Sequence, residues 1–166
     1  PDICTMAKGI NNAAVPMGAV IADKKIYDVF LDGTKAGVEF FHGYTYSAHP
    51  LAVAAGIASQ AIYKEECIYD RVKENAQHFE EGMHSLKGSP HITDIRNIGL
   101  AGGLTIAQRD GVVGARANDF FLKAYELGMG IRGNGDTIAI APILTSSKQE
   151  LDPIFDILQK TSNQIK

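Results

Sequence analysis

The sequence predicts a mixed α/β fold in two parts, and three patterns in the chain support this prediction. Short apolar runs with β-branched residues near the start of the chain are typical of strands. The stretch 51–64 is apolar or small on nearly every helical face, which is typical of a buried helix. The stretch 70–86 instead has one apolar face and one charged face. We therefore divide the chain into residues 1–65 and 66–166.

The first part begins with two strand candidates. Residues 1–7 are expected to form a short buried strand, and residues 18–22 form a second strand. Apolar residues at helical spacing indicate a helix over 24–31 that ends at Gly33. The following segment, 32–46, is irregular, and we expect its aromatic rings to pack against this chain, another subunit or a ligand. These rings belong to Phe40, Phe41, Tyr44 and Tyr46.

The last element of the first part is the apolar helix. Ser47 is expected to cap this helix, because a serine hydroxyl accepts a hydrogen bond from the first turn. Pro50 fits that first turn, where its missing N–H costs no hydrogen bond. Since residues 51–64 are apolar on nearly all sides, we expect the helix to run through the middle of the molecule.

The second part begins with the amphipathic helix over 70–86, which Gly88 and Pro90 end. Two short strands are expected next, over 92–98 and 104–107. We interpret the glycine cluster between them as a bulge or tight bend rather than a dinucleotide-binding loop. The cluster consists of Gly99, Gly102 and Gly103.

Another helix is expected over 115–127, closed by Gly128. Strand candidates at 130–132 and 137–141 flank a Gly-Asn-Gly-Asp turn at 133–136, in which the Asn-Gly pair at 134–135 is a strong hairpin signal.

The chain closes with a helix that follows a capping box, from Ser147 to Glu150. Pro153 conflicts with a start at that position, because proline breaks the hydrogen bonding of a helix interior. The sequence leaves a later start open. The expected inward face consists of Leu151, Ile154, Phe155 and Leu158.

The composition is that of an ordinary globular protein. Of the 166 residues, 45% are hydrophobic and 21% are charged, and the net charge is −3. This balance gives no reason to expect nucleic acid or an anionic membrane as a partner. No apolar run approaches the roughly 18 residues of a membrane span. Cys4 and Cys67 lack metal-ligand spacing, so free thiols in a reducing, cytoplasmic setting are expected.

Lys8 is the first candidate catalytic residue. It follows an extended stretch and is the only charged residue between positions 6 and 22, where asparagines, glycines and a proline predict a tight turn. In poorly hydrated surroundings the charged form of an amine is disfavoured, so its pKa falls and it becomes a nucleophile toward carbonyl groups. The alternative is an ordinary lysine on a solvated loop.

The stretch 42–50, with the sequence HGYTYSAHP, is a candidate phosphate site. It places the hydroxyls of Thr45 and Ser47 just before a helix start, whose N–H groups are unpaired. Ordinary helix capping with aromatic packing explains the same residues. The glycine spacing and the lysine of a P-loop are absent.

Arg132 is a candidate for binding a carboxylate. Its guanidinium is expected to project from the end of a short strand, and such a fork binds a carboxylate through two hydrogen bonds. A surface arginine is the alternative. No histidine pair has metal-site spacing on a predicted helix, so no metal is expected. The other arginines of the second part are interpreted as surface or structural: Arg71, Arg96, Arg109 and Arg116.

Four motifs together resemble the C-terminal part of class III pyridoxal phosphate (PLP) aminotransferases. In chain order they are MAKGINNAAVPMGAVI, HGYTYSAHPLAVAAG, DIRNIGLAG and IRGNGDTIAIAPIL. The resemblance covers essentially the whole chain and is greatest to the ω-amino acid (β-alanine):pyruvate transaminases. It implies the type I PLP fold. In that fold, residues 1–65 finish the large domain with the interdomain helix, and residues 66–166 form the small C-terminal domain.

The resemblance implies transfer of an amino group from an ω-amino acid or amine to pyruvate. Lys8 matches the lysine that forms the internal aldimine, a Schiff base, with PLP and then moves a proton as general base and acid. Thr45, with Tyr44 beside it, matches the threonine that reaches the cofactor phosphate of the neighbouring subunit. The site would therefore be complete only in a homodimer or tetramer. Arg132 matches the arginine that binds the substrate carboxylate and swings aside for substrates without one.

The family's aspartate at the pyridine nitrogen, its main phosphate loop and its stacking ring lie upstream of the lysine. The chain also begins at Pro1 rather than Met. We therefore expect it to be part of a longer protein, and by itself to bind PLP poorly and not to transaminate. Alternatives are another class III PLP enzyme or a non-catalytic dimerisation module. The enzymes considered are an ornithine- or γ-aminobutyrate-type transaminase, an aminomutase and a dialkylglycine decarboxylase.

Overall fold

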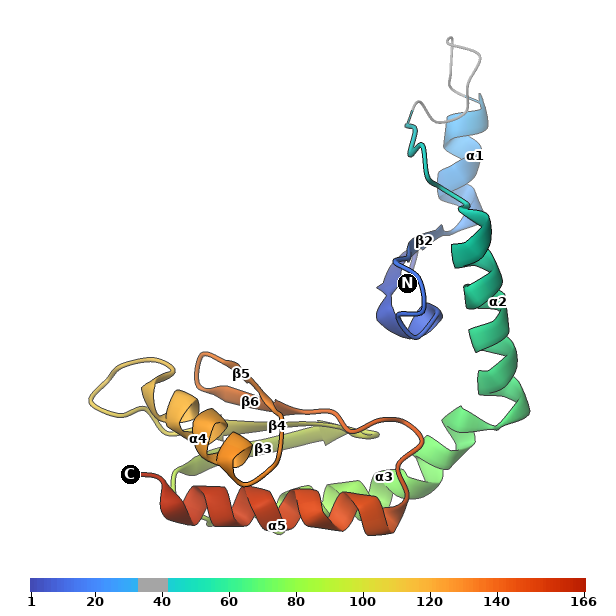
Figure 1. The fold of residues 1–166 in the computed structure, drawn as a ribbon. Helices are drawn as coiled ribbons and strands as arrows, with labels where there is room; N and C mark the ends of the chain where they lie inside the picture. Colours follow the sequence, from blue (N-terminus) through green and yellow to red (C-terminus); the bar gives the residue numbers. More distant parts are fainter. Residues whose placement is uncertain (33–41) are drawn as a thin grey trace. The chain divides into compact units, whose positions relative to one another are not determined.

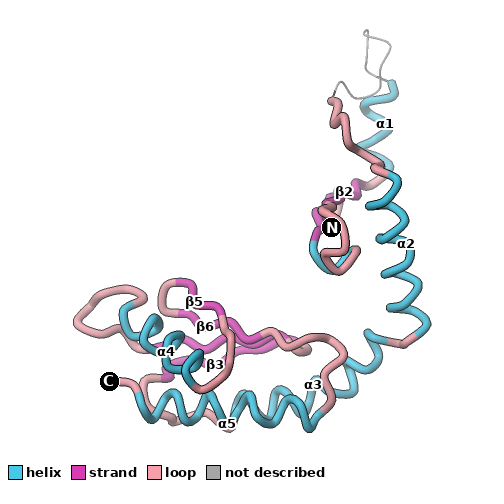
Figure 2. The backbone as a smooth tube through the Cα atoms, viewed as in Figure 1, coloured by secondary structure: helices cyan, strands magenta, loops and turns pink. Residues whose placement is uncertain are grey.

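The computed structural model of the chain describes residues 1–32 and 42–166. These residues divide into two compact units, Pro1–Cys67 and Ile68–Lys166, which we call the first and the second unit. Figures 1 and 2 show helices and strands in both units. The expected helix end at Gly33 and the rings of Phe40 and Phe41 lie outside the described residues.

The first unit contains a two-stranded antiparallel sheet and two α-helices. Its elements are β1 (Ile3–Ala7), the 3-10 helix η1 (Lys8–Ile10), β2 (Gly18–Ala22), α1 (Lys24–Asp32) and α2 (Pro50–Glu65). Both predicted strands and both predicted helices are therefore confirmed. Asn11, just after η1, is 1% exposed, and its side-chain amide donates to the carbonyl of Val15. This buried hydrogen bond fixes the connection between the strands, because an unpaired buried amide is costly.

The prediction that Ser47 caps α2 is wrong. His49 occupies the N-cap position and makes no side-chain capping bond, whereas Pro50 is the first helical residue, as predicted. Ser47 instead lies in a turn, where its N–H donates to the carbonyl of Tyr44 at 3.0 Å. Two residues too far upstream, the Ser47 hydroxyl cannot bond the first turn of the helix.

The expected burial of the first unit is also wrong for the described chain. Only Ala52 and Gly56 of α2 are buried, and Leu51 and Ile57 are 67% and 68% exposed. β1 is likewise exposed at four of its five positions. The physical reason is that the small sheet and its connection offer a surface to only one side of α2. A helix that is apolar on all sides is expected to be covered by other surfaces, but the pattern does not show which surfaces cover it.

The second unit is a four-stranded antiparallel sheet with three helices. Its helices are α3 (Ile68–His84), α4 (Ala115–Glu126) and α5 (Lys148–Gln164). Its strands are β3 (Ile92–Ile98), β4 (Ala101–Ile106), β5 (Arg132–Asn134) and β6 (Thr137–Ile140), in the sheet order β3-β4-β6-β5. All predicted elements of this part are present, with ends displaced by a few residues. Figure 1 shows α3 and α5 running side by side.

A single hydrophobic core joins the three helices to one face of this sheet. Phe79 of α3, Phe120 of α4 and Leu158 of α5 are all 0% exposed, as are Leu104 of β4 and Ile138 of β6. Residues that alternate with these on the strands point to the other face, as strand geometry requires. The side chains of this open face are largely exposed in the described chain.

Two of the predicted glycine features need correction. Gly102 and Gly103 lie within β4 rather than between the strands, and they allow close packing there. A Cβ on Gly102 would lie 2.7 Å from the Cε of Met83. The hairpin loop is Gly135–Asp136, which lies inside the predicted turn but one residue after the Asn-Gly pair, because Asn134 still pairs with Thr137.

The capping box before α5 is confirmed. The backbone N–H and the hydroxyl of Ser147 both donate to the Glu150 carboxylate at 2.8 Å. Pro153 lies inside the helix, which continues through it. The start predicted by the capping box is therefore correct, and Pro153 removes only one backbone donor from the second turn.

Candidate active site

Lys8 lies at the point where β1 ends and η1 begins. Its φ angle is 54°, in the left-handed region that a residue with a side chain rarely adopts. Such backbone strain is concentrated at functional positions. The Lys8 side chain is exposed, so the expected poorly hydrated surroundings are not present in the described chain. The reason is the same lack of cover that exposes β1.

Two side chains of α2 hold the loop that carries Lys8. The Tyr63 hydroxyl donates to the carbonyl of Gly9 at 2.9 Å, and the Gln60 amide donates to the carbonyl of Ile10 at 3.2 Å. Neither side chain is among the residues predicted from the sequence. A signal exists, since Gln60 and Tyr63 are three residues apart on a mostly apolar helix and such residues share a face.

A hollow of about 800 Å³ lies between the two strands and the start of α2. Met6 and Tyr44 line it, together with residues from the strand connection and the first turn of the helix. Lys8 is two residues from Met6, and Thr45 is next to Tyr44. The hollow is therefore lined by Tyr44, one of the predicted site residues, and by a residue near Lys8, although Lys8 and Thr45 themselves do not line it.

Thr45 and Tyr44 lie in the turn that leads into α2. Thr45 is exposed, and Tyr44 is 71% exposed with its ring edge-on to the ring of His42 at 4.4 Å. The first turn of α2 receives no side-chain capping bond. An exposed hydroxyl and the unpaired N–H groups of a helix start are each suited to bind an anion such as phosphate.

Arg132 is the first residue of β5, in the second unit. It is exposed and makes no side-chain hydrogen bond or ion pair with the described residues. Other arginines are engaged: Arg71 donates to a backbone carbonyl at 3.0 Å, and Arg116 donates to three backbone oxygens at 2.6, 2.7 and 3.0 Å. Arg109 pairs with the carboxylate of Asp119. Their predicted structural role is confirmed, and Arg132 stands apart from them.

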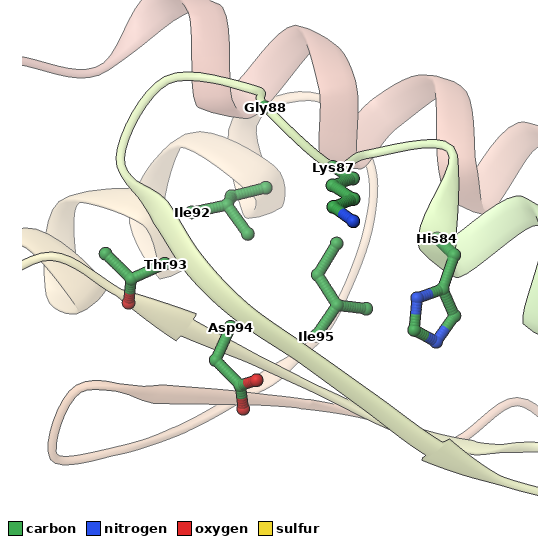
Figure 3. Close-up of a pocket in the computed structure, with 7 residues that line it drawn as sticks. All are labelled: His84, Lys87, Gly88, Ile92, Thr93, Asp94 and Ile95. Atoms are coloured by element: carbon green, nitrogen blue, oxygen red, sulfur yellow. The ribbon is translucent and has the colours of Figure 1, made fainter.

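A second, smaller hollow of about 270 Å³ lies between the end of α3 and strand β3 (Figure 3). None of the predicted site residues lines it. Its lining consists of His84, Lys87, Gly88, Ile92, Thr93, Asp94 and Ile95. In residues 1–32 and 42–166, no group of three histidine, cysteine or acidic side chains is placed to hold a metal ion. Every helix in the same ranges is too short or too polar to cross a bilayer.

Residues 1–161 match the family model for class III aminotransferases. The chain belongs to this family. Class III aminotransferases depend on PLP, and the predicted cofactor class is therefore confirmed for the family.

Curated relatives match nearly the whole chain. An omega-aminotransferase of Caulobacter vibrioides is 43% identical, over 99% of this chain and 38% of its own length. A beta-alanine–pyruvate aminotransferase of Pseudomonas aeruginosa is 44% identical, over 99% of this chain and 37% of its own length. A mitochondrial gamma-aminobutyrate transaminase of Oryza sativa is 34% identical, over 95% and 32%. The chain thus spans less than two fifths of the length of these relatives.

Solved structures confirm the predicted type I PLP fold. A transaminase from a study of directed evolution by ancestral reconstruction has a TM-score of 0.90 at 26% identity, covering 99% of this chain and 38% of that chain. A transaminase from the marine bacterium Virgibacillus has a TM-score of 0.87, also at 26% identity, covering 99% and 39%.

Proposed function

We propose that this chain supplies three functional groups to an ω-amino acid:pyruvate aminotransferase. They are the amine of Lys8, the hydroxyl of Thr45 and the guanidinium of Arg132. The relatives named for ω-amino acids or β-alanine, at 43% and 44% identity, favour this substrate class over γ-aminobutyrate, whose plant enzyme is 34% identical. The transferred amino group would pass from an ω-amino acid or amine to pyruvate, giving alanine.

Lys8 is the observation that carries the proposal. Its exposed amine stands on a strained residue at a strand end, in a loop tied to α2 by two hydrogen bonds. PLP, when bound, supplies an aldehyde that condenses with amines and a ring that withdraws electrons from the substrate carbon. The Lys8 amine would bind the cofactor covalently. Once released by substrate, it would carry the proton between the substrate carbon and the cofactor.

Thr45 is proposed to donate a hydrogen bond to a cofactor phosphate. Its exposed hydroxyl precedes the uncapped start of α2, which favours an anion, and Tyr44 helps from the same turn. Following the family resemblance, the phosphate belongs to the neighbouring subunit. We therefore propose a homodimer or a tetramer in which two chains complete each site.

Arg132 is proposed to bind the substrate carboxylate. Its guanidinium is exposed and has no partner among the described residues, so both of its paired donors are available to a carboxylate. We assign residues 1–65 to the end of the large domain and 66–166 to the small domain of the enzyme. By itself the 166-residue chain is proposed to bind PLP weakly and not to transaminate.

Borohydride reduction of the full-length, PLP-loaded protein tests the role of Lys8. Reduction fixes PLP to the amine that binds it, and peptide mapping then identifies that amine. We expect the label on Lys8 and its loss in Lys8→Ala. A matched control is Lys24→Ala, whose amine pairs with Asp28 on the surface at 2.6 Å. A label on any other lysine, or no label at all, contradicts the proposal, and the latter result favours a non-catalytic dimerisation module.

The amino donor is tested separately. The γ-aminobutyrate-type transaminase is the second candidate, favoured by the rice relative. Steady-state rates of the full-length protein with β-alanine and with γ-aminobutyrate, each with pyruvate as acceptor, separate the two. We expect the larger kcat/KM for β-alanine, and the reverse order would select the second candidate.

A further inference from the structure

The open face of the four-stranded sheet carries a second arginine in line with Arg132. In the strand register, Arg96 of β3 lies opposite Gly103 of β4, Gly103 lies opposite Ala139 of β6, and Ala139 lies opposite Arg132 of β5. Directly opposed residues of antiparallel strands project to the same face. The two arginines are therefore the two ends of one row, with only a glycine and an alanine between them.

Arg96 is held in a defined position on this face. Its Nη1 donates to the Asp94 carboxylate at 2.7 Å and to the Thr105 hydroxyl at 2.8 Å, and its Nη2 donates to the Thr137 hydroxyl at 3.2 Å. Thr137 belongs to β6, two strands away from β3. The Arg96 side chain therefore reaches across β4 toward Arg132. The side chain passes over Gly103, where a Cβ would lie 3.4 Å from the Arg96 guanidinium carbon.

The arrangement leaves donors and space for a ligand. A guanidinium has five N–H groups. Arg96 uses three of them in the bonds above, and Arg132 uses none with the described residues. Ala139 is exposed between them, and β5 lies one strand spacing, about 4.8 Å, from β6. A small anion over Ala139 is thus within reach of both guanidinium groups.

Charge favours an anion at this place. Asp94 is already engaged by Arg96, so it offsets only one of the two positive charges of the row. Neighbouring guanidinium groups repel each other, and an anion between them relieves that repulsion. A carboxylate also matches the planar fork of each group.

We propose that the substrate carboxylate binds over Ala139, between Arg132 and Arg96, and that Arg96 is a second residue that binds it. This proposal rests on the proposed transamination and on the role of Arg132 in it. Arg132 is unanchored, whereas Arg96 is fixed by three side chains. Arg96 thus provides a permanent positive charge when Arg132 changes its orientation for a substrate without a carboxylate.

The test uses the full-length, PLP-loaded protein and two amino donors of similar shape. Alanine and isopropylamine differ only in that a methyl group replaces the carboxylate. Single-turnover absorbance changes give the apparent Kd and the maximal rate for each donor. We expect Arg96→Gln to raise the apparent Kd of alanine about tenfold or more, as the loss of a charged hydrogen bond predicts, and to leave isopropylamine unchanged. Equal losses for both donors, or no loss for alanine, overturn the proposal.

A second variant tests the site without touching either arginine. Ala139→Val fills the space between the two groups with a side chain that strands accept well. It should raise the apparent Kd of alanine and leave that of isopropylamine unchanged. Ala101→Val is the matched control, because Ala101 is also exposed on this face of the sheet but lies opposite Ile98, outside the row. If Ala139→Val and Ala101→Val have the same effect on alanine, no carboxylate binds over Ala139.

Arg132→Gln separates this proposal from the proposed function. If Arg132→Gln raises the apparent Kd of alanine while Arg96→Gln and Ala139→Val do not, Arg132 keeps its role and Arg96 has none. If Arg132→Gln leaves alanine unchanged, the role of Arg132 itself fails, and the shared site fails with it.

Discussion

The two units of this chain differ in how much of their own structure they stabilise. The second unit buries a continuous apolar cluster, in which Phe79, Phe120 and Leu158 are fully inaccessible to water. In the first unit, Ala52 has the one buried apolar side chain among residues 1–32 and 42–67. Since burial of apolar surface is the main favourable term in folding, the second unit should supply most of the stability of the described chain.

The difference also explains where the proposed chemistry lies. Lys8 and Thr45 belong to the first unit, which exposes apolar surface at Val20, Leu51 and Ile57. Exposed apolar surface of this extent is typical of a region that contacts another protein surface. Arg132 belongs to the second unit, on a sheet whose other face is fully packed. The proposed carboxylate site therefore lies on a well-packed sheet, whereas the proposed site of Lys8 lies in a unit whose described residues bury little apolar surface.

The largest expected effect is the difference between truncating a buried residue of the second unit and truncating an exposed residue of the first unit. Phe120→Ala should destabilise the chain by about 3–5 kcal/mol, because it leaves a cavity in the core of the second unit. Ile57→Ala removes a side chain that is 68% exposed and should cost less than about 0.5 kcal/mol. Urea unfolding of the 166-residue chain, followed by far-UV circular dichroism, measures both. Similar losses would mean that α2 is packed as tightly as the second unit.

A smaller effect of opposite sign is expected from the same substitution in the two units. Gly82→Ala on α3 would place its Cβ on the ring of Phe155, so overpacking should cost about 1–3 kcal/mol. Gly56→Ala on α2 would meet the flexible side chain of Met17 at 3.4 Å and the carbonyl of Ile10 at 3.9 Å, both at ordinary contact distances. The higher helix propensity of alanine should then stabilise the chain by up to about 1 kcal/mol. The midpoints of urea unfolding show whether each substitution stabilises or destabilises the chain. Stabilisation by Gly82→Ala would contradict the packing of α3 on α5.

The comparison also marks what can be predicted from the sequence. Elements that pack within their own unit were predictable, because their periodicity reports contacts that the chain itself makes. One apolar face and one charged face at helical spacing predict α3. The capping box from Ser147 to Glu150 predicts the start of α5 despite Pro153. In the first unit the apolar helix is correctly predicted, but its burial is not. The composition of residues 51–64 indicates that they favour burial, but it does not indicate which surface covers them.

The candidate site divides in the same way. Motifs of neighbouring residues suffice to propose Lys8, Thr45 and Arg132 as candidates. Arg96 is not among these candidates, because its place in one row with Arg132 depends on the sheet order β3-β4-β6-β5, which no local pattern contains. Strand pairings far apart in sequence become visible only with the fold. The same holds for Tyr63, whose hydroxyl reaches the loop of Lys8.

The last and smallest effect concerns acid sensitivity of the hairpin that carries Arg132. The Asp136 carboxylate accepts the N–H of Gly114 at 2.6 Å and the amide of Gln108 at 2.7 Å, and these bonds lower its pKa, the N–H of Gly114 first. Hydrogen bonds from Ser147 lower the pKa of Glu150 in the same way. Carboxyl groups with a lowered folded-state pKa stabilise the fold fully above their unfolded pKa, about 4, and lose this contribution as the pH falls through the folded value.

Stability of the chain should therefore decline as the pH falls below about 4, and Asp136→Asn should make that decline shallower. Urea midpoints at several values between pH 7 and pH 2 measure the slope. Glu126→Gln is the control for the loss of one negative charge, since Glu126 pairs with Lys123 at the surface, at 2.5 Å, among the described residues.

Hydrogen exchange at the same pH values locates the part of the chain that loses stability. Earlier exchange at β5 and β6 than at α3 is expected, because Asp136 ties their hairpin to the start of α4, whereas α3 is held by the core. Uniform acid exchange throughout the second unit would show that Asp136 does not control the hairpin.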